Sequence, residues 1–389
     1  MINNSLNKAV AIPDFVYAVF AQQQVTAGNG FSVHFGHFGK QAEIPVLNVG
    51  GKFNDRTSSF SGTADAPYDS ILVNLATYDL QMTLDGTRVW QYLASSVLQA
   101  PQHRTVDDSD VTAEVENALI ELYLQYCAEK NDLLMVQGKG VEPTTFTFTD
   151  AYNSLLDQVV GAVSEYAPVN GVQAFTAYNY TQIGSVLTLT VASANANLRV
   201  GDIITFYPSN ASPLKGLDFV VTDIASTTIT ATAYSNVSGI ASESGTGVAG
   251  TAHYVNELNI TANLARLISA VPNKFRSTSG FGFYMSTRLL ELYKVAQANN
   301  SVAGGFDPSG EKAMEYLGKP IYGLDAMPPN MIISGSPRNF HVVSGNEEDF
   351  NQLLFKNMKD VTLDYEYRVR ASFKTGVGVY IDDAIRIIK

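Results

Sequence analysis

The sequence predicts an α+β fold that contains a long helix, a long antiparallel strand and an inserted all-β segment. Residues 108–137 carry apolar side chains at helical spacing, with no Gly or Pro. Residues 362–374 alternate strictly between apolar and polar, which is typical of a strand with one exposed face. Only six of the 86 residues from Asn170 to Val255 are charged, against 16% of the whole chain. This composition marks the segment as a separate β-rich part.

Composition excludes several classes of function. The chain has 389 residues, of which 46% are hydrophobic, so it can bury a large core and divide into sub-domains. With 25 Lys+Arg against 37 Asp+Glu the net charge is −12, and no basic tract offers tight binding to nucleic-acid phosphates. The single cysteine, Cys127, excludes an intramolecular disulfide and a Cys-rich zinc site. No apolar run approaches the roughly 20 residues that span a bilayer. The stretch 9–21 lacks a cleavage site, so we expect no signal peptide.

The first part of the chain predicts an arm and a hairpin. Residues 1–40 have little periodicity and several glycines, and we expect an extended arm. Residues 44–49 and 71–84 are predicted strands, and the polar segment 50–69 between them predicts a projecting hairpin. A two-stranded hairpin is not stable alone, so we expect its apolar face to need a partner. The apolar residues of that face in the second strand are Tyr78, Leu80, Met82 and Leu84.

The long helix and the long strand are predicted to pack on each other. Residues 107–110 supply N-cap candidates for the helix, and at 1.5 Å per residue it is about 40 Å long. The strand 362–374 is also about 40 Å long at 3.3 Å per residue. The predicted apolar face of the helix consists of Val111, Val115, Ala118, Leu119, Leu122 and Tyr126.

The β-rich segment and the residues after it predict a further set of short elements. Alternation of β-branched residues at 186–191 and 228–232 predicts antiparallel strands. Helical spacing returns at 258–271 and 287–299. Short strands are predicted around 320–322, 331–333 and 340–343.

A search for catalytic or ligand-binding residues finds none that is convincing. The G-x-G-x-x-G match at 245–250 has no βαβ unit around it and is interpreted as a loop. His34 and His37 would need a third ligand to hold a metal ion, and we interpret them as surface or interface histidines. Cys127 is interpreted as a small core residue, and Asp382-Asp383 as a loop rather than a cation site. We therefore predict no catalytic, cofactor-binding or metal-binding residue, no cofactor, and a protein that is not an enzyme but contacts other protein chains.

The order of the elements resembles the major capsid protein of tailed bacteriophages, the Hong Kong 97-like fold. Everything outside 168–256 carries this resemblance, as an arm, a long hairpin, a spine helix, mixed α/β elements and one long strand. The segments that carry it are Leu317-Gly-Lys-Pro-Ile-Tyr, Pro328-Pro-Asn-Met-Ile-Ile-Ser-Gly, Asn339-Phe-His-Val-Val and Tyr367-Arg-Val-Arg-Ala-Ser-Phe-Lys-Thr-Gly-Val-Gly-Val-Tyr-Ile-Asp-Asp-Ala-Ile.

The resemblance implies a division of the chain into the parts of that fold. The domains would be an N-terminal arm (1–40), an E-loop (41–85), a P-domain with the spine helix 108–137 (86–167 and 344–374), an inserted β-domain (168–256) and an A-domain (257–343 and 375–389). It also implies an assembly interface, for which the candidate residues are Lys52, Phe53, Arg56, Phe60, Phe15, Tyr17, Phe31 and Phe35. Some members crosslink an E-loop lysine, and Lys52 is suitably placed, although a lysine at a polar tip is usually only solvated.

The implied function is self-assembly into the icosahedral capsid shell that encloses a double-stranded DNA genome. The implied partners are other copies of the chain in hexamers and pentamers, with a portal protein and in some cases a decoration protein. Because the arm begins almost at once, we expect scaffolding to come from a separate protein. The location would be the virion, after synthesis and assembly in the cytoplasm of the bacterial host, with no membrane and no tight nucleic-acid partner.

Three alternatives stay open. An encapsulin-like compartment shell shares the fold, although encapsulins generally lack a large β-insertion. A phage tail or surface adhesin would fit the Thr- and Ser-rich segment, but it leaves the long helix unexplained. An enzyme with dispersed carboxylates is the third alternative.

Overall fold

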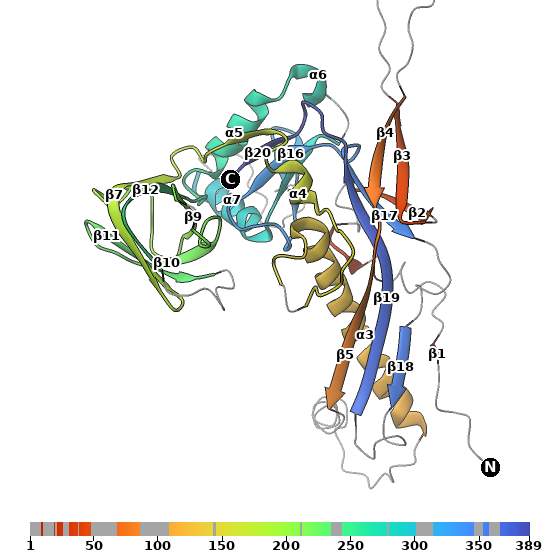
Figure 1. Cartoon of the computed structure of the whole chain (residues 1–389). Helices are drawn as coiled ribbons and strands as arrows, with labels where there is room; N and C mark the ends of the chain where they lie inside the picture. The colour runs from red at the N-terminus through yellow and green to blue at the C-terminus, as the bar shows by residue number, and fades with distance from the viewer. Residues whose placement is uncertain are drawn as a thin grey trace, which may run out of the picture. The chain divides into compact units, whose positions relative to one another are not determined.

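The computed structural model divides the chain into two compact units. One unit is Met1–Leu155 with Phe340–Tyr380, and the other is Leu156–Asn339 with Ile381–Lys389 (Figure 1). The residues that the structure describes are 9–10, 19, 22–25, 31–37, 39–47, 68–85, 109–142, 145–210, 212–234, 243–277, 280–300, 314–345, 353–357 and 366–389.

The first unit contains a six-stranded sheet, a two-stranded sheet and a long helix. The strand order of the larger sheet is β1-β18-β19-β17-β2, with β5 also paired to β19, and β3 pairs only with β4. The elements are β1 (Ala9–Val10), β2 (Ser32–His37), β3 (Gln41–Leu47), β4 (Tyr68–Asn74), β5 (Ala76–Asp85), α3 (Ser109–Gln137), β17 (Phe340–Gly345), β18 (Leu353–Asn357) and β19 (Glu366–Val379). Because β2 runs parallel to β17 in this sheet, the last part of the predicted arm is a strand.

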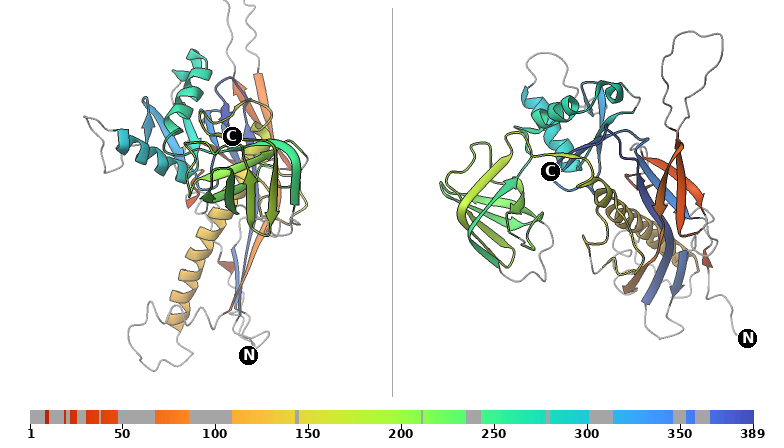
Figure 2. Two further views of the ribbon diagram at one scale, coloured as in Figure 1. Left: turned by 90° about the vertical axis from the view of Figure 1, so that its left-hand side faces the viewer. Right: turned by 45° about the horizontal axis from the view of Figure 1, so that its top comes forward.

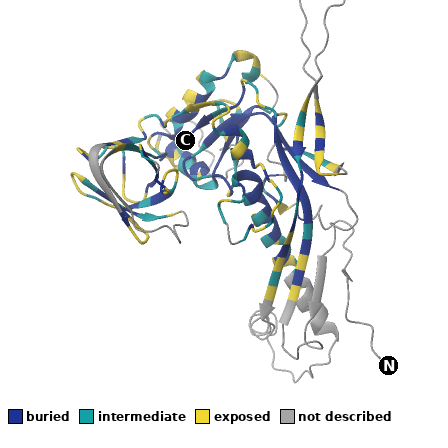
Figure 3. Cartoon of the chain, viewed as in Figure 1, coloured by how far each residue is buried: buried dark blue, intermediate teal, exposed yellow. Residues whose placement is uncertain are grey.

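The long strand β19 is the centre of the first unit. It pairs antiparallel with β5 over ten register positions, from Glu366 opposite Asp85 to Thr375 opposite Ala76. The predicted alternation is confirmed in the described residues, where Val369 is buried and Arg368 is exposed (Figure 3). The strand continues to Val379, past the predicted end at residue 374, and its last residues are buried on both faces because β4 crosses them.

Helix α3 begins and ends where the sequence predicts, but the described part buries a different face. Tyr123, Cys127 and Leu134 are buried, whereas Leu122 is 53% exposed. The predicted face was therefore wrong at Leu122. The buried stripe includes the polar Asn131, which hydropathy does not select. The side chains of the first helical turns, including Val111, Val115, Ala118 and Leu119, lie outside the described residues.

The predicted strand 71–84 is two strands with different partners. Strand β4 pairs with β3 in the hairpin, whereas β5 pairs with β19. Tyr78 and Leu80 of β5 are 5% and 7% exposed, so this apolar face is covered by its own chain. The resemblance implied that a neighbouring chain covers this face, and for Tyr78 and Leu80 that expectation was wrong. Alternation along a strand does not say which neighbouring strand or helix covers it.

The base of the hairpin lies on the sheet at two glycines of β19. A Cβ atom on Gly376 would lie 2.3 Å from the carbonyl oxygen of Asn74, and one on Gly378 would lie 2.4 Å from a methyl group of Val73. The two strands therefore approach each other more closely than any larger residue allows. The small apolar cluster formed there contains Ala42, Ile44, Val73, Leu75 and Val343.

The second unit contains a mixed sheet with helices and a closed barrel. The sheet order is β14-β15-β13-β16-β20-β6. Its elements are α4 (Leu155–Val159), which begins at the boundary, β6 (Ser164–Tyr166), α5 (Ile260–Ala270), α6 (Asn273–Arg276), β13 (Gly282–Met285), α7 (Thr287–Asn300), β14 (Glu315–Tyr316), β15 (Lys319–Gly323), β16 (Ile332–Gly335) and β20 (Arg386–Ile388). The helices predicted at 258–271 and 287–299 are thus confirmed as α5 and α7.

The barrel has the strand order β10-β11-β8-β7-β12-β9 and closes on itself (Figure 2). Stacked Phe175 and Phe206 and edge-on Phe219 fill its interior, so it is a packed core rather than a pore. The strands predicted at 186–191 and 228–232 are confirmed as β8 and β11. The barrel strands are β7 (Val172–Ile183), β8 (Val186–Thr190), β9 (Ile203–Pro208), β10 (Asp218–Ile224), β11 (Thr228–Ala233) and β12 (Glu243–His253).

The close approach at the hairpin base predicts the effect of a single added methyl group. Gly376→Ala should lower the free energy of unfolding by about 1–3 kcal/mol, because its Cβ has no room beside the Asn74 carbonyl. Gly140→Ala is the matched control, since nothing lies within 4 Å of a Cβ at that position. Urea unfolding of both variants measures the difference. Equal stabilities would contradict the packing described.

Candidate functional site

The assembly residues predicted from sequence are only partly described by the structure. Phe31 is 8% exposed, and its ring stacks on Phe340 with 5.1 Å between centroids, so it serves the fold of its own chain. Phe35, on β2, is 40% exposed. The other candidates lie outside the described residues, namely Phe15, Tyr17, Lys52, Phe53, Arg56 and Phe60.

The β3–β4 hairpin has one buried and one exposed face. Ile44 and Val73 point to the sheet, whereas Glu43 and Leu72 on the opposite face are exposed. Leu72 is 65% exposed, although the next residue of the same strand, Val73, is 1% exposed. Sequence reasoning did not single it out, because the segment was expected to continue as one strand to Leu84.

Part of the N-terminal arm is held against helix α3. Val19, Gln23 and Val25 are at most 1% exposed. The Asp132 carboxylate on α3 accepts hydrogen bonds from the backbone N–H groups of Gln24 at 2.8 Å and of Val25 at 3.4 Å. Among the described residues, the side-chain amide of Gln23 is buried with no hydrogen-bond partner at either its nitrogen or its oxygen. The carboxylate therefore fixes this segment, while the buried amide opposes its docking.

Polar groups also join α3 to the two long strands. The Tyr78 hydroxyl donates to Asn131 Oδ1 at 2.9 Å and lies 2.8 Å from the hydroxyl of Thr375. The Tyr123 hydroxyl donates to the Leu80 carbonyl at 2.5 Å. Burial raises the pKa of Cys127 to about 12, so the thiol stays protonated near neutral pH. This confirms Cys127 as a small core residue.

The remaining candidate ligands have structural contacts. His34 Nε2 lies 3.0 Å from His341 Nδ1 on the adjacent strand, and the side chain of His37 lies outside the described residues. Asp382 accepts a hydrogen bond from the backbone of the loop, and Asp383 pairs with Arg386 at 3.5 Å. Within the described ranges, no group of three or more His, Cys, Asp or Glu could hold a metal ion.

The glycine-rich match at 245–250 is on strand β12, so its interpretation as a loop was wrong. The register of β12 against β7 shifts on either side of Val248. A Cβ on Gly250 would lie 2.5 Å from the ring of Phe175 and 2.6 Å from the carbonyl oxygen of Tyr207. This glycine therefore allows close packing inside the barrel rather than an approach to phosphate.

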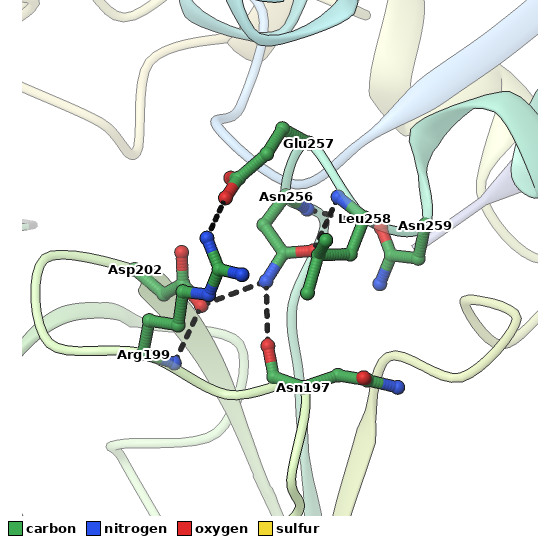
Figure 4. Close-up of polar contacts among 7 residues, drawn as sticks. All are labelled: Asn197, Arg199, Asp202, Asn256, Glu257, Leu258 and Asn259. Carbon is green, nitrogen blue, oxygen red and sulfur yellow. Dashed lines mark hydrogen bonds and ion pairs between the residues drawn. The ribbon is translucent and has the colours of Figure 1, made fainter. Parts of the chain in front are cut away.

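A polar cluster fixes the end of the barrel where β12 leads to helix α5 (Figure 4). Asn256 Nδ2 donates to the Asn197 carbonyl at 2.8 Å and to Asp202 Oδ2 at 2.9 Å, and the backbone N–H of Arg199 donates to the same carboxylate. The Arg199 side chain pairs with Glu257. Burial raises the pKa of Asp202, while the hydrogen bonds from Asn256 and Arg199 lower it.

Asn330, which precedes β16, joins the barrel to the mixed sheet. Its Oδ1 accepts a hydrogen bond from Val255 N at 3.1 Å. Its Nδ2 lies within hydrogen-bond distance of the carbonyls of Ile203 and His253, at 2.9 and 3.4 Å, and of the Thr205 hydroxyl at 3.0 Å. One fully buried amide therefore links β9 and β12 to the mixed sheet.

Among the described residues, no helix is long and apolar enough to cross a membrane.

The unpaired amide in the arm predicts a stabilising substitution. Gln23→Met keeps the length of the side chain and removes the buried polar group, so the docked arm should become about 1–3 kcal/mol more stable. Limited proteolysis near residues 19–25 should slow accordingly. Gln24→Met, at a half-buried neighbour, should leave the rate close to wild type. Faster cleavage of the Gln23 variant would contradict the burial of this segment.

The link at Asn330 predicts a local loss of stability. Asn330→Ala leaves the Val255 N–H and the facing carbonyls unpaired, which should cost about 2–4 kcal/mol. Hydrogen exchange of the amides in β9 and β12 should become faster. The exposed Asn273→Ala serves as the control and should change little. Unchanged exchange in the Asn330 variant would show that the barrel does not depend on this contact.

Comparisons with known proteins find similar solved structures. No protein-family model and no curated protein matches the sequence. The satellite phage P4 procapsid including size determination (Sid) protein is 9% identical, with a TM-score of 0.47 over 97% of this chain and 99% of that chain. The capsid of a native GTA particle computed with C5 symmetry is 14% identical, with a TM-score of 0.42 over 94% and 90%. A virus-like particle from Pyrococcus furiosus is 8% identical, with a TM-score of 0.41 over 97% and 96%.

Proposed function

We propose that this chain is a structural protein that assembles with its own copies into the icosahedral capsid shell of a tailed bacteriophage, around a double-stranded DNA genome. The hairpin β3–β4 is the observation that carries the proposal. It is a two-stranded sheet of its own, and its inner face is fixed at the glycines of β19. Its outer face presents Leu72, which is 65% exposed.

The fixed base and the exposed outer face suit a contact with a neighbouring subunit. A hairpin held at Gly376 and Gly378 keeps its direction, so less conformational freedom is lost when its outer face is covered. An exposed leucine on that face gains free energy when a neighbour removes it from water. We assign the hairpin β3–β4 and the residues between its strands as the E-loop on this basis, with the part around Lys52 as its tip. The predicted E-loop, 41–85, also included β5, which pairs with β19 instead.

The remaining parts receive assignments consistent with the same fold. Helix α3 with strands β5 and β19 forms the spine of the P-domain, to which we assign 86–167 and 344–374. The mixed sheet with α5 and α7 supports an A-domain in 257–339 and 381–389. The predicted A-domain also included 340–343 and 375–380, which belong to the first unit. The barrel, with its own core and the polar link at Asn330, supports an insertion at 168–256 that projects as a rigid body.

The net negative charge of the chain supports a shell wall that does not bind the packed DNA tightly. Each copy carries a net charge of −12, so phosphates of packed DNA are repelled rather than bound. Contacts between copies are then mainly apolar and hydrogen-bonded, and many modest contacts act together in a closed shell. The partners proposed are other copies of the chain in hexamers and pentamers, with scaffolding and portal proteins.

Deletion of residues 50–65 tests the proposal. The deletion leaves β3, β4 and the glycine contacts in place, so the chain should fold but should not assemble. Circular dichroism measures folding, and negative-stain electron microscopy measures assembly. Leu72→Gln is a milder variant. It should weaken assembly and leave the free energy of unfolding within about 0.5 kcal/mol of the wild-type value.

Each other outcome has a definite meaning. Closed shells formed by the deletion variant would refute the E-loop assignment. Tubes or spikes formed by the wild-type chain would favour the tail or adhesin function, and small monomers at every concentration would refute assembly altogether. Shells that enclose an enzyme rather than DNA would favour an encapsulin-like compartment.

A further inference from the structure

The turn between β14 and β15 places a leucine in an unfavourable backbone conformation. The two-residue turn is Leu317–Gly318, with φ angles of 51° and 70°. Two-residue hairpins with both central φ angles positive favour Asn-Gly or Asp-Gly. A Cβ is crowded at positive φ, which glycine avoids and which Asn and Asp offset by hydrogen bonds from their short polar side chains. The other described non-glycine residue with a positive φ is Asn170, at 51°, a residue type that tolerates this conformation. Leu317 therefore departs from the local preference of its turn.

The side chain of Leu317 is covered only slightly by its own chain. Leu317 is 74% exposed, more than any other large hydrophobic side chain that the structure describes, and nearby Met314 is 42% exposed. A β-carbon on the following Gly318 would meet nothing within 4 Å, so the tip projects into open space. The backbone conformation of Leu317 costs free energy, and its exposed side chain recovers little of that cost within the chain. A contact outside the chain explains why leucine occupies this position.

The base of this hairpin is held firmly. The Tyr293 hydroxyl on α7 donates to the Glu315 carbonyl at 2.8 Å, and Ile321 N donates to the Met314 carbonyl at 2.7 Å. The Tyr316 ring packs edge-on against Phe283 and Tyr293, with both centroid distances at 6.3 Å. The tip is thus presented in a defined position, which reduces the entropy lost when it is bound.

We propose that Leu317 is a contact residue between copies of this chain, buried by a second copy in the assembled state. This inference rests on the proposed function and adds a site to it. An apolar tip does not recognise a phosphate backbone, and two copies that each carry −12 repel each other, so uncharged contacts are the favourable ones between them. We assign the contact as head to tail, with the tip of one copy against a different surface of the next, because such contacts generate rings when the rotation closes.

The substitution Leu317→Asn separates folding from assembly. Asparagine suits the turn, so the thermal midpoint of the unassembled chain should stay the same or rise. The concentration at which half of the chains assemble should rise on the order of tenfold, because one apolar side chain is no longer buried between copies. Light scattering against protein concentration measures assembly, and calorimetry measures the midpoint.

A matched control and two further outcomes decide the inference. Ile183→Asn removes another exposed apolar side chain beside a turn, 71% exposed on the barrel, and should leave the assembly concentration unchanged. Assembly of the Leu317 variant at the wild-type concentration, or an equal shift in the Ile183 variant, would overturn the inference. If wild-type chains associate without forming shells, the proposed function fails, and loss of that association in the Leu317 variant, seen by sedimentation, still supports the contact.

Discussion

The pairing of β5 with β19 is the interaction on which the first unit depends. Ten consecutive register positions join two strands that are far apart in the sequence. Buried hydrogen bonds then attach α3 to both strands through Tyr78 and Tyr123. A long helix or a long strand has little stability alone, but together they bury one continuous apolar face. Loss of one buried partner would leave another polar group unpaired, so the contacts support one another.

The position of β19 also determines what the rest of the unit presents. Its glycines at 376 and 378 bring the hairpin onto the sheet, so one hairpin face is used inside the chain and the other faces outward. The arm is attached to the same helix by Asp132. In the second unit, the barrel and the β14–β15 hairpin each have a firm base and an exposed end. In both units, exposed apolar side chains therefore lie on well-supported strands or turns.

The sequence predicted the elements well where local pattern determines them. The boundaries of α3, α5 and α7 and the alternation of β19 follow from spacing alone. The partner of β5 did not follow, because alternation shows that one face is apolar without saying what covers it. The buried face of α3 was missed because it includes the polar Asn131, whose Oδ1 accepts a hydrogen bond from Tyr78, a residue distant in the sequence. Leu317 was quoted only as part of a resembling segment, because its significance depends on a φ angle that sequence does not reveal.

Sedimentation velocity of the purified wild-type chain over a range of concentrations tests the central claim most directly. The claim is that exposed residues on rigid supports drive copies of this chain to form a closed shell. We expect a cooperative transition from small species to one large, uniform particle, with few intermediates. A chain that remains a 42.1 kDa monomer at every concentration, or that grows without limit, would contradict it.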